Sequence, residues 1–214
     1  MLQILRSVEL CTIIQEIMNA LEKLIASNYE GAYTYQQYRS LIDELHEQGK
    51  VTGPTQSEAL LAYSKMNVQR MNRWDKHAKL SEDSKNAVKS IDEKMTWLII
   101  TEGWCGDAAQ IVPVIEKMAE ENPLIQTRFI LRDENLEIMD MYLTNGKSRS
   151  IPIILLINSE GNVVGKFGPR PTAAQDLIDQ LKEEGADGEV VKKNSISGMP
   201  AINTHISKWS LSLC

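Results

Sequence analysis

The spacing of apolar residues predicts three amphipathic helices in the first part of the chain. Between residues 2 and 28, apolar side chains recur at steps of three and four, which is the period of one helix face. A second stripe runs over residues 34–48, and a third helix begins at Ser57. The expected core positions of this third helix are Leu60, Leu61, Met66, Met71 and Trp74. The pattern predicts an all-helical N-terminal region over residues 1–84.

From Met95 the pattern changes to short apolar runs that alternate with helical periods. The expected strands are 96–101, 124–131, 151–158 and 163–167, and the expected helices are 107–121, 134–145 (Leu136, Met139 and Leu143 inward) and 171–184. Long crossovers favour parallel pairing of the first strands, and a short turn gives one antiparallel pair. The prediction is a three-layer α/β/α domain with a mixed sheet over residues 85–184, followed by a polar tail over 185–214 that has room for a short helix.

Composition narrows the class of protein. The chain has 214 residues, 43% of them hydrophobic, and a formal net charge of −6, which is typical of a soluble globular protein and argues against nucleic-acid binding. No apolar run approaches the roughly 20 residues that a membrane span needs. His46 and His77 are isolated among charged residues, so we expect surface positions for them and no metal site.

The three cysteines are widely spaced, and only one stands where chemistry is expected. Cys11 lies on the first apolar stripe as a small buried residue, and Cys214 lies in the tail. The absence of a paired pattern indicates free thiols in a reducing cytoplasm. Cys105 follows a buried strand and opens a helix, where unpaired backbone N–H groups favour a thiolate. It is the candidate nucleophile.

Several motifs around this cysteine together resemble the thioredoxin family. They are Trp104-Cys105-Gly106 at the first strand-to-helix turn, Pro113 in the helix, Arg149-Ser150-Ile151-Pro152 before an apolar strand, Gly161 in a hairpin turn and Phe167-Gly168 before the last helix. The resemblance covers roughly residues 85–184. The whole chain also looks like a bacterial thioredoxin-like subfamily with one active-site cysteine, through Thr34-Tyr35, Gln56-Ser57-Glu58 and the stretch from Glu102 to Gln110.

This resemblance implies a thioredoxin-like fold and a site with two parts. Cys105 is the expected nucleophile, with Trp104, Gly106 and Asp107 beside it. Ile151 and Pro152 are the expected substrate-binding loop, with a cis bond at Pro152 that the family resemblance implies.

Three departures change the expected chemistry. The position of the family's resolving cysteine is Ala108, so an intramolecular second step is impossible within the motif. The family's middle proline is Asp107, which either opposes thiolate formation by charge or simply caps the helix. The buried acid expected on the leading strand is Ile99.

Two functions from different classes follow. The first is a monothiol thiol–disulfide oxidoreductase that acts on a protein or low-molecular-weight disulfide. It needs no bound cofactor, and glutathione, another small thiol or Cys214 would resolve its adduct. The second is a non-catalytic module that binds peptides or proteins in the groove beside Trp104, Ile151 and Pro152. An iron–sulfur site of the monothiol glutaredoxin kind and peroxide reduction rank lower. The three N-terminal helices are expected to pack on the sheet or to form a homodimer.

Overall fold

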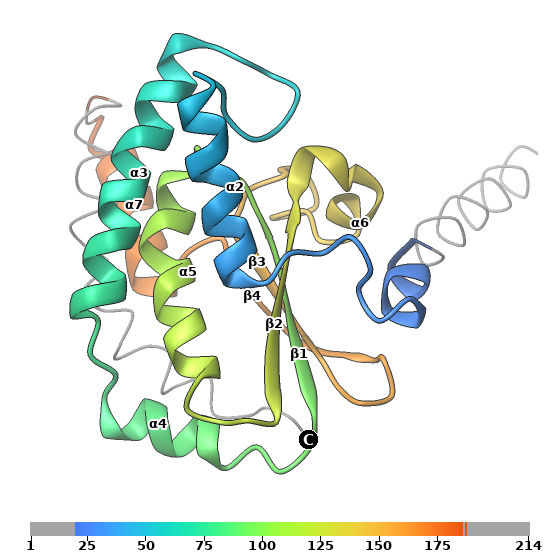
Figure 1. Ribbon diagram of the computed structural model, residues 1–214. Coiled ribbons are helices and arrows are strands. Elements are labelled where there is room, and N and C mark those ends of the chain that lie inside the picture. Colours follow the sequence, from blue (N-terminus) through green and yellow to red (C-terminus); the bar gives the residue numbers. More distant parts are fainter. Residues whose placement is uncertain (1–19, 186, 188–214) are drawn as a thin grey trace, which may run out of the picture.

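A four-stranded mixed sheet forms the centre of the molecule in the computed structural model, which describes residues 20–185 and 187 (Figure 1). The strands are β1 (Met95–Thr101), β2 (Ile125–Leu131), β3 (Ile153–Ile157) and β4 (Val163–Phe167), in the spatial order β2-β1-β3-β4. β1 pairs parallel with β2 and antiparallel with β3, and β4 returns antiparallel to β3. The predicted α/β class with a mixed sheet is confirmed.

The central strand β1 is buried along its whole length. All seven of its residues are buried, including Leu98, Ile99 and Ile100. A strand covered on both faces has no polar face, which explains why its sequence is a continuous apolar run rather than an alternation. β1 therefore forms a rigid support that ends just before Cys105.

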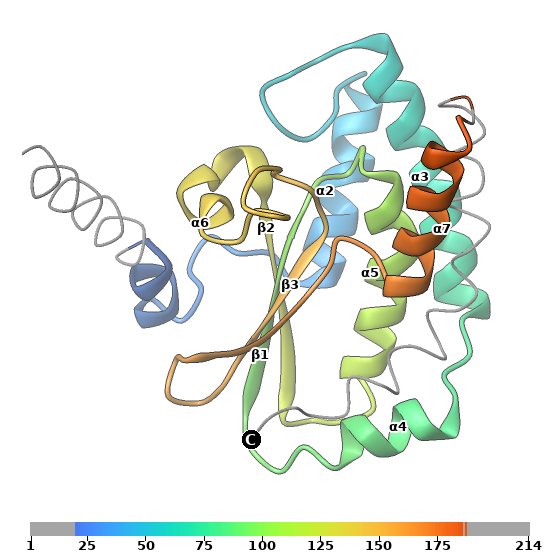
Figure 2. The same ribbon diagram turned by 180° about the vertical axis from the view of Figure 1, so that it is seen from behind.

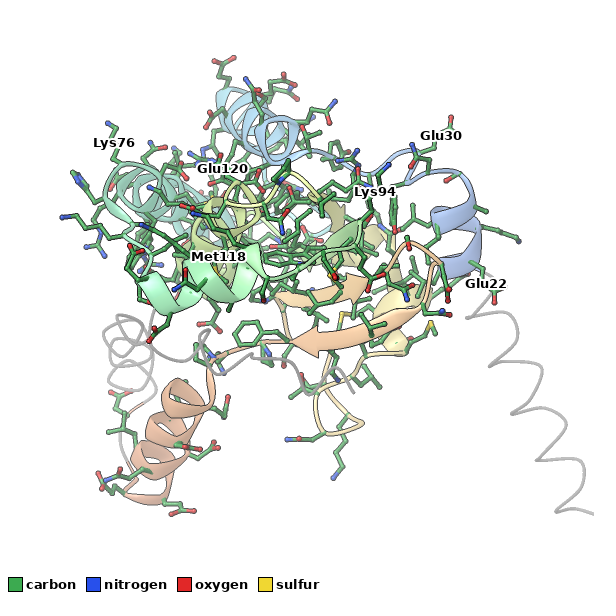
Figure 3. The ribbon with its side chains drawn as sticks, turned by 90° about the horizontal axis from the view of Figure 1, so that it is seen from below. Glu22, Glu30, Lys76, Lys94, Met118 and Glu120 are labelled. Carbon is green, nitrogen blue, oxygen red and sulfur yellow. The ribbon has the colours of Figure 1, made fainter. Side chains whose placement is uncertain are left out.

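Helices cover both faces of the sheet. Figures 1 and 2 show α3, α5 and α7 on one side, and α6 with the helical residues 20–26 on the other. The helices are α2 (Tyr35–Glu47), α3 (Glu58–His77), α4 (Glu82–Lys89), α5 (Gly106–Ala119), α6 (Leu136–Asp140) and α7 (Thr172–Glu183), with a 3-10 turn at Arg132–Glu134. Seen from below, α4 crosses near Met118, which is buried at the end of α5 (Figure 3).

The N-terminal helices pack on the sheet and on α5 of the same chain. α3 lies along α5, and the Trp74 indole N–H donates to the Gln110 side chain across this contact. From α2, the buried ring of Tyr38 stacks on Phe129 of β2 with ring centroids 5.3 Å apart. The apolar faces of both helices are thus buried within one chain. The expected homodimer stays a prediction.

The extent of one expected helix and two expected core positions were wrong. The helix expected over 134–145 is much shorter, because Asn145 and Gly146 take positive φ values and a Thr144–Ser148 bridge closes a turn there. Leu136 is consequently exposed, and Ile138 and Met139 are the buried residues of this segment. Met66 of α3 is also exposed. His46 is half-buried, and its Nε2 lies 2.7 Å from the Ser64 hydroxyl.

Within the described residues, no helix is long and apolar enough to cross a membrane. The same residues contain no cluster of His, Cys, Asp and Glu side chains that could hold a metal ion. Cys11, Cys214 and the short helix expected in the tail lie outside the described residues.

Candidate functional site

Cys105 stands at the junction between β1 and α5. It is the N-cap of α5, with an extended backbone, and its Sγ accepts a hydrogen bond from the Ala108 amide at 3.5 Å. Its own amide donates to the Glu102 carbonyl at 3.1 Å. The predicted position of Cys105 at the start of a helix is confirmed. The Ala108 amide is one of the N-terminal amides that no carbonyl of the helix can satisfy.

The loop before β3 lies directly against the thiol. The Cys105 thiol donates a hydrogen bond to the Ile151 carbonyl, with 3.3 Å between sulfur and oxygen. The Ile151–Pro152 peptide bond is cis, and both residues are buried. Gly168 closes the other side of this loop with φ +113, and a Cβ on it would lie 2.1 Å from the Pro152 carbonyl oxygen. Only glycine permits this approach.

The environment of Cys105 favours the neutral thiol. The residue is 8% exposed, and burial raises the pKa of its thiol to about 12, with the Asp107 charge as the second cause. Hydrogen bonds from the Ala108 and Asp107 amides and the Arg170 charge act in the opposite direction on this pKa. Desolvation is the larger effect. The thiol is therefore protonated at neutral pH, in agreement with its role as donor to Ile151.

Asp107 is held by an arginine from another part of the chain. The Arg170 guanidinium forms an ion pair with the Asp107 carboxylate at 2.5 Å, and the Asp107 side chain is only 13% exposed. Burial nevertheless raises the pKa of Asp107, while Arg170 and Arg70 lower it. Because this charge lies beside Cys105, the state of the ion pair acts on the thiol.

A third arginine, Arg132, packs over the ring of Trp104. The Arg132 guanidinium carbon lies 4.9 Å from the centroid of the Trp104 ring, within reach of a cation–π contact. Arg132 is also tied to Asp133 by an ion pair of 2.7 Å and donates to the Arg149 carbonyl at 3.3 Å. Trp104 is half-buried under this side chain, so the ring and the turn after β2 hold one another in place.

The N-terminal region fixes the backbone just before Trp104. The Gly103 amide donates to the Thr52 hydroxyl at 2.9 Å, and the Gly103 carbonyl accepts from the Asn67 side chain at 3.0 Å. Thr52 and Asn67 are buried, so both bonds are shielded from water. Ile42 packs on the same glycine, at 3.0 Å from the position of a Cβ. Gly103 is therefore clamped from two sides.

A buried carboxyl group sits behind this loop. Glu102 is fully buried, and its Oε1 accepts the Asp133 amide at 2.9 Å. Its Oε2 has no hydrogen-bond partner within the described part of the chain. Burial raises the pKa of Glu102 and the Asp133 charge adds to the rise, while Thr52, the Asp133 amide and the Arg132 charge act to lower it. Glu102 is thus a buried acid whose carboxyl group faces Asp133 and Gly53, whereas the strand position expected for an acid is Ile99.

The structure brings the predicted site residues Cys105, Asp107 and Ile151 into one cluster, with Trp104, Gly106 and Pro152 next to them in the chain. Reasoning from the sequence missed Thr52, Asn67, Arg70, Glu102 and Arg170. For two of these residues, the sequence contained a feature that could have pointed to the site. Glu102 is an acid at the end of an apolar strand, and Arg70 belongs to the basic half of α3. The others are ordinary residues in loops or on a helix face.

A family model agrees with this architecture, and two solved structures resemble the chain. A family model described as thioredoxin matches residues 53–182. A crystal structure of an HIV epitope-scaffold of the 4E10 series aligns with 84% of this chain and 100% of its own, at 15% identity and a TM-score of 0.50. A Pseudomonas aeruginosa protein of unknown function aligns with 80% of this chain and 98% of its own, at 15% identity and a TM-score of 0.45. No curated protein matches the chain.

Proposed function

Since this chain belongs to the thioredoxin family, we propose that it exchanges thiols and disulfides through a single cysteine, Cys105. The observation that carries the proposal is the contact of 3.3 Å between the Cys105 sulfur and the Ile151 carbonyl oxygen. A chain segment that pairs with the backbone of the Ile151–Pro152 loop would bring its own sulfur to this place. The proposed substrate is a protein or low-molecular-weight disulfide.

The proposed reaction has two exchange steps. Cys105 loses its proton to solvent, and its thiolate attacks one sulfur of a disulfide R–S–S–R′. A mixed disulfide Cys105–S–S–R forms, and the thiolate R′–S⁻ leaves. An external thiol such as glutathione then attacks the R sulfur, so that Cys105 leaves as thiolate and R is released in a new disulfide. The external thiol replaces the resolving cysteine, because Ala108 stands at that position. A reducing bacterial cytoplasm would supply such a thiol.

The second candidate is a module that binds peptides without turnover. A specific observation favours it, because the thiol is 8% exposed and burial raises its pKa to about 12. A thiol in this state at neutral pH is a poor nucleophile. In this case Trp104, Ile151 and Pro152 would contact a partner while Cys105 only fills the core.

A glutathione-coupled disulfide reductase assay separates the two candidates. The wild type is expected to be faster than Cys105→Ser, while Cys11→Ser should match the wild type. Cys214→Ser tests whether the tail cysteine resolves the adduct instead of an external thiol. Mass spectrometry of each cysteine after reaction with a disulfide should find the adduct on Cys105. Equal rates for the wild type and Cys105→Ser would leave the binding module as the function.

A further inference from the structure

Three arginines from distant parts of the chain lie around Cys105 and its neighbours. Arg70 comes from α3, Arg132 from the turn after β2, and Arg170 from the segment before α7. Two of them are already engaged with carboxylates, Arg132 with Asp133 and Arg170 with Asp107. The charges of Arg132 and Arg170 are therefore largely neutralised by these carboxylates, which leaves Arg70 as the arginine of the three without an ion pair.

Arg70 has a cationic group beside Gly106, the residue that follows Cys105, and no carboxylate of its own. Its Nη1 donates to the Asn67 amide oxygen at 2.9 Å and lies 3.4 Å from the point where a Cβ on Gly106 would stand. Gly106 directly follows Cys105. Among residues 20–185 and 187, Arg70 forms no ion pair, and the carboxylate that acts on its charge, Asp107, is paired with Arg170.

The surroundings of Arg70 neutralise its charge only in part. Partial burial and the neighbouring Arg73 both lower the pKa of Arg70, whereas the Asp107 charge, which is already paired with Arg170, raises it. An anion that binds to the exposed side of a half-buried guanidinium stabilises its positive charge, and does so more when a second cation lies nearby. Asn67 accepts a hydrogen bond from one nitrogen of the Arg70 guanidinium, and the remaining N–H groups of Arg70 can donate to a carboxylate.

We propose that Cys105 acts on disulfides that carry a carboxylate close to the sulfur, and that Arg70 binds this carboxylate. The inference rests on the proposed function, because it assigns the substrate class of the same thiol. The Arg70 guanidinium, beside Gly106, holds the carboxylate while the thiolate attacks. The exchange keeps its atom balance: Cys105–S⁻ and R–S–S–R give Cys105–S–S–R and R–S⁻.

The test compares two small disulfides on the same protein. Oxidised glutathione carries carboxylates, whereas bis(2-hydroxyethyl) disulfide is neutral. Formation of the Cys105 adduct is followed by mass spectrometry at fixed pH. We expect Arg70→Gln to slow the reaction with oxidised glutathione by about tenfold or more, the loss typical of a hydrogen bond to a charged group. The reaction with the neutral disulfide should change by less than about twofold.

Two further variants and a salt titration sharpen the test. Arg70→Lys keeps a point charge without the fork, so its rate with oxidised glutathione should fall between those of the wild type and Arg70→Gln. Lys76→Gln removes the same charge further along α3, at a side chain that points outward in Figure 3, and should leave both rates unchanged. Added salt should slow the wild-type reaction with oxidised glutathione more than that with the neutral disulfide.

The outcomes distinguish the proposed substrate class from the proposed thiol–disulfide exchange by Cys105. If Arg70→Gln slows both disulfides equally, or neither, the carboxylate assignment is overturned while the exchange chemistry of Cys105 stands. If the wild type forms an adduct with neither disulfide on Cys105, the exchange function is overturned together with the assignment. A melting curve of Arg70→Gln shows whether the variant is folded, and Arg70→Lys provides the second reading if it is not.

Discussion

Cys105 is held from two sides, and the two sides contact different parts of it. The helical N-terminal region binds the backbone before the cysteine: Thr52 and Asn67 form hydrogen bonds with the amide and the carbonyl of Gly103. The C-terminal half contacts the reactive groups, since the Ile151 carbonyl accepts a hydrogen bond from the thiol and Arg170 pairs with Asp107. The first side fixes where the cysteine stands, and the second side sets its protonation. Changes on the two sides should therefore have separable effects.

The largest effect is expected from Gly168→Ala on the C-terminal side. The new Cβ would stand 2.1 Å from the Pro152 carbonyl oxygen, so the loop against Cys105 has to move. We expect the free energy of unfolding to fall by about 3 kcal/mol or more, as measured by denaturant titration. Gly146→Ala is the matched control, because Gly146 also has a positive φ but open space around it. It should lose only about 1 kcal/mol.

Equal losses in the two glycine variants would mean that backbone conformation alone accounts for Gly168. The close packing of the Pro152 loop would then contribute nothing to stability, and the C-terminal side would be looser than the distances indicate.

The second prediction uses pH to measure how strongly the fold prefers the neutral thiol. The pKa of Cys105 is raised from its ordinary value of 9.0 to about 12. Above about pH 9 the unfolded chain loses the thiol proton while the native protein keeps it. Stability from this group is therefore complete below pH 9 and is lost as the pH rises towards 12, by up to about 1.4 kcal/mol per pH unit.

Cys105→Ser lacks this titration, whereas all other groups are common to both proteins. The difference in unfolding free energy between the wild type and Cys105→Ser should thus shrink as the pH rises above 9. Denaturant titrations at several pH values measure it. A difference that is independent of pH would show that the thiol has the same pKa in the native and unfolded chains, and that the C-terminal side does not bias protonation.

Much of the fold was predictable because its signals are local. Ser57 caps α3 and Thr34 forms a capping box at the start of α2, both within one turn of the helix they begin. Cys105 could be placed at a helix start for the same reason. The short α6 was not predictable from periodicity alone, since the turn at Asn145 and Gly146 competes with the helical pattern.

The partners of the site could not be predicted, because they are far away in the chain. Thr52 reaches Gly103 across 51 residues, and Asn67 reaches it across 36. A buried threonine or asparagine has no periodic signature that names its partner. The same holds for Arg170, which is one of many charged residues in the sequence until the fold places it on Asp107.

The third prediction concerns the N-terminal side. Asn67→Ala removes the donor to the buried Gly103 carbonyl and leaves that group unsatisfied, so the free energy of unfolding should fall by about 2 kcal/mol. Asn67→Ala also removes the acceptor of the Arg70 bond, but Asn67 does not touch the thiol, and the charges that act on the pKa of Cys105 come from Asp107 and Arg170. The pH dependence of Cys105 alkylation should therefore change little. Gln69→Ala removes an exposed amide side chain from the same helix and is the control with a smaller expected loss. A shifted alkylation profile in Asn67→Ala would remove the distinction between the two sides.

The smallest effects are expected in a pair of variants with opposite signs. The Asp107 charge raises the pKa of Cys105 and the Arg170 charge lowers it. Asp107→Asn should therefore lower this pKa, and Arg170→Gln should raise it. A fall of one pKa unit gives about ten times more thiolate at a pH well below the pKa, but each thiolate is then about threefold less nucleophilic. The net change in rate is about threefold.

Alkylation with uncharged iodoacetamide measures this rate without attraction of the reagent by the arginines. Asp107→Asn should react faster than the wild type and Arg170→Gln slower, each by about threefold for every pKa unit by which the substitution changes Cys105. Glu82→Gln makes the same charge change in the exposed pair with Lys85 on α4 and should react like the wild type. If both site variants were faster, the ion pair would act as a cover that keeps reagent from the thiol, and its removal would open the site whatever the charge. Opposite signs would instead show that the C-terminal side acts on Cys105 through its charges, as the contact between Arg170 and Asp107 indicates.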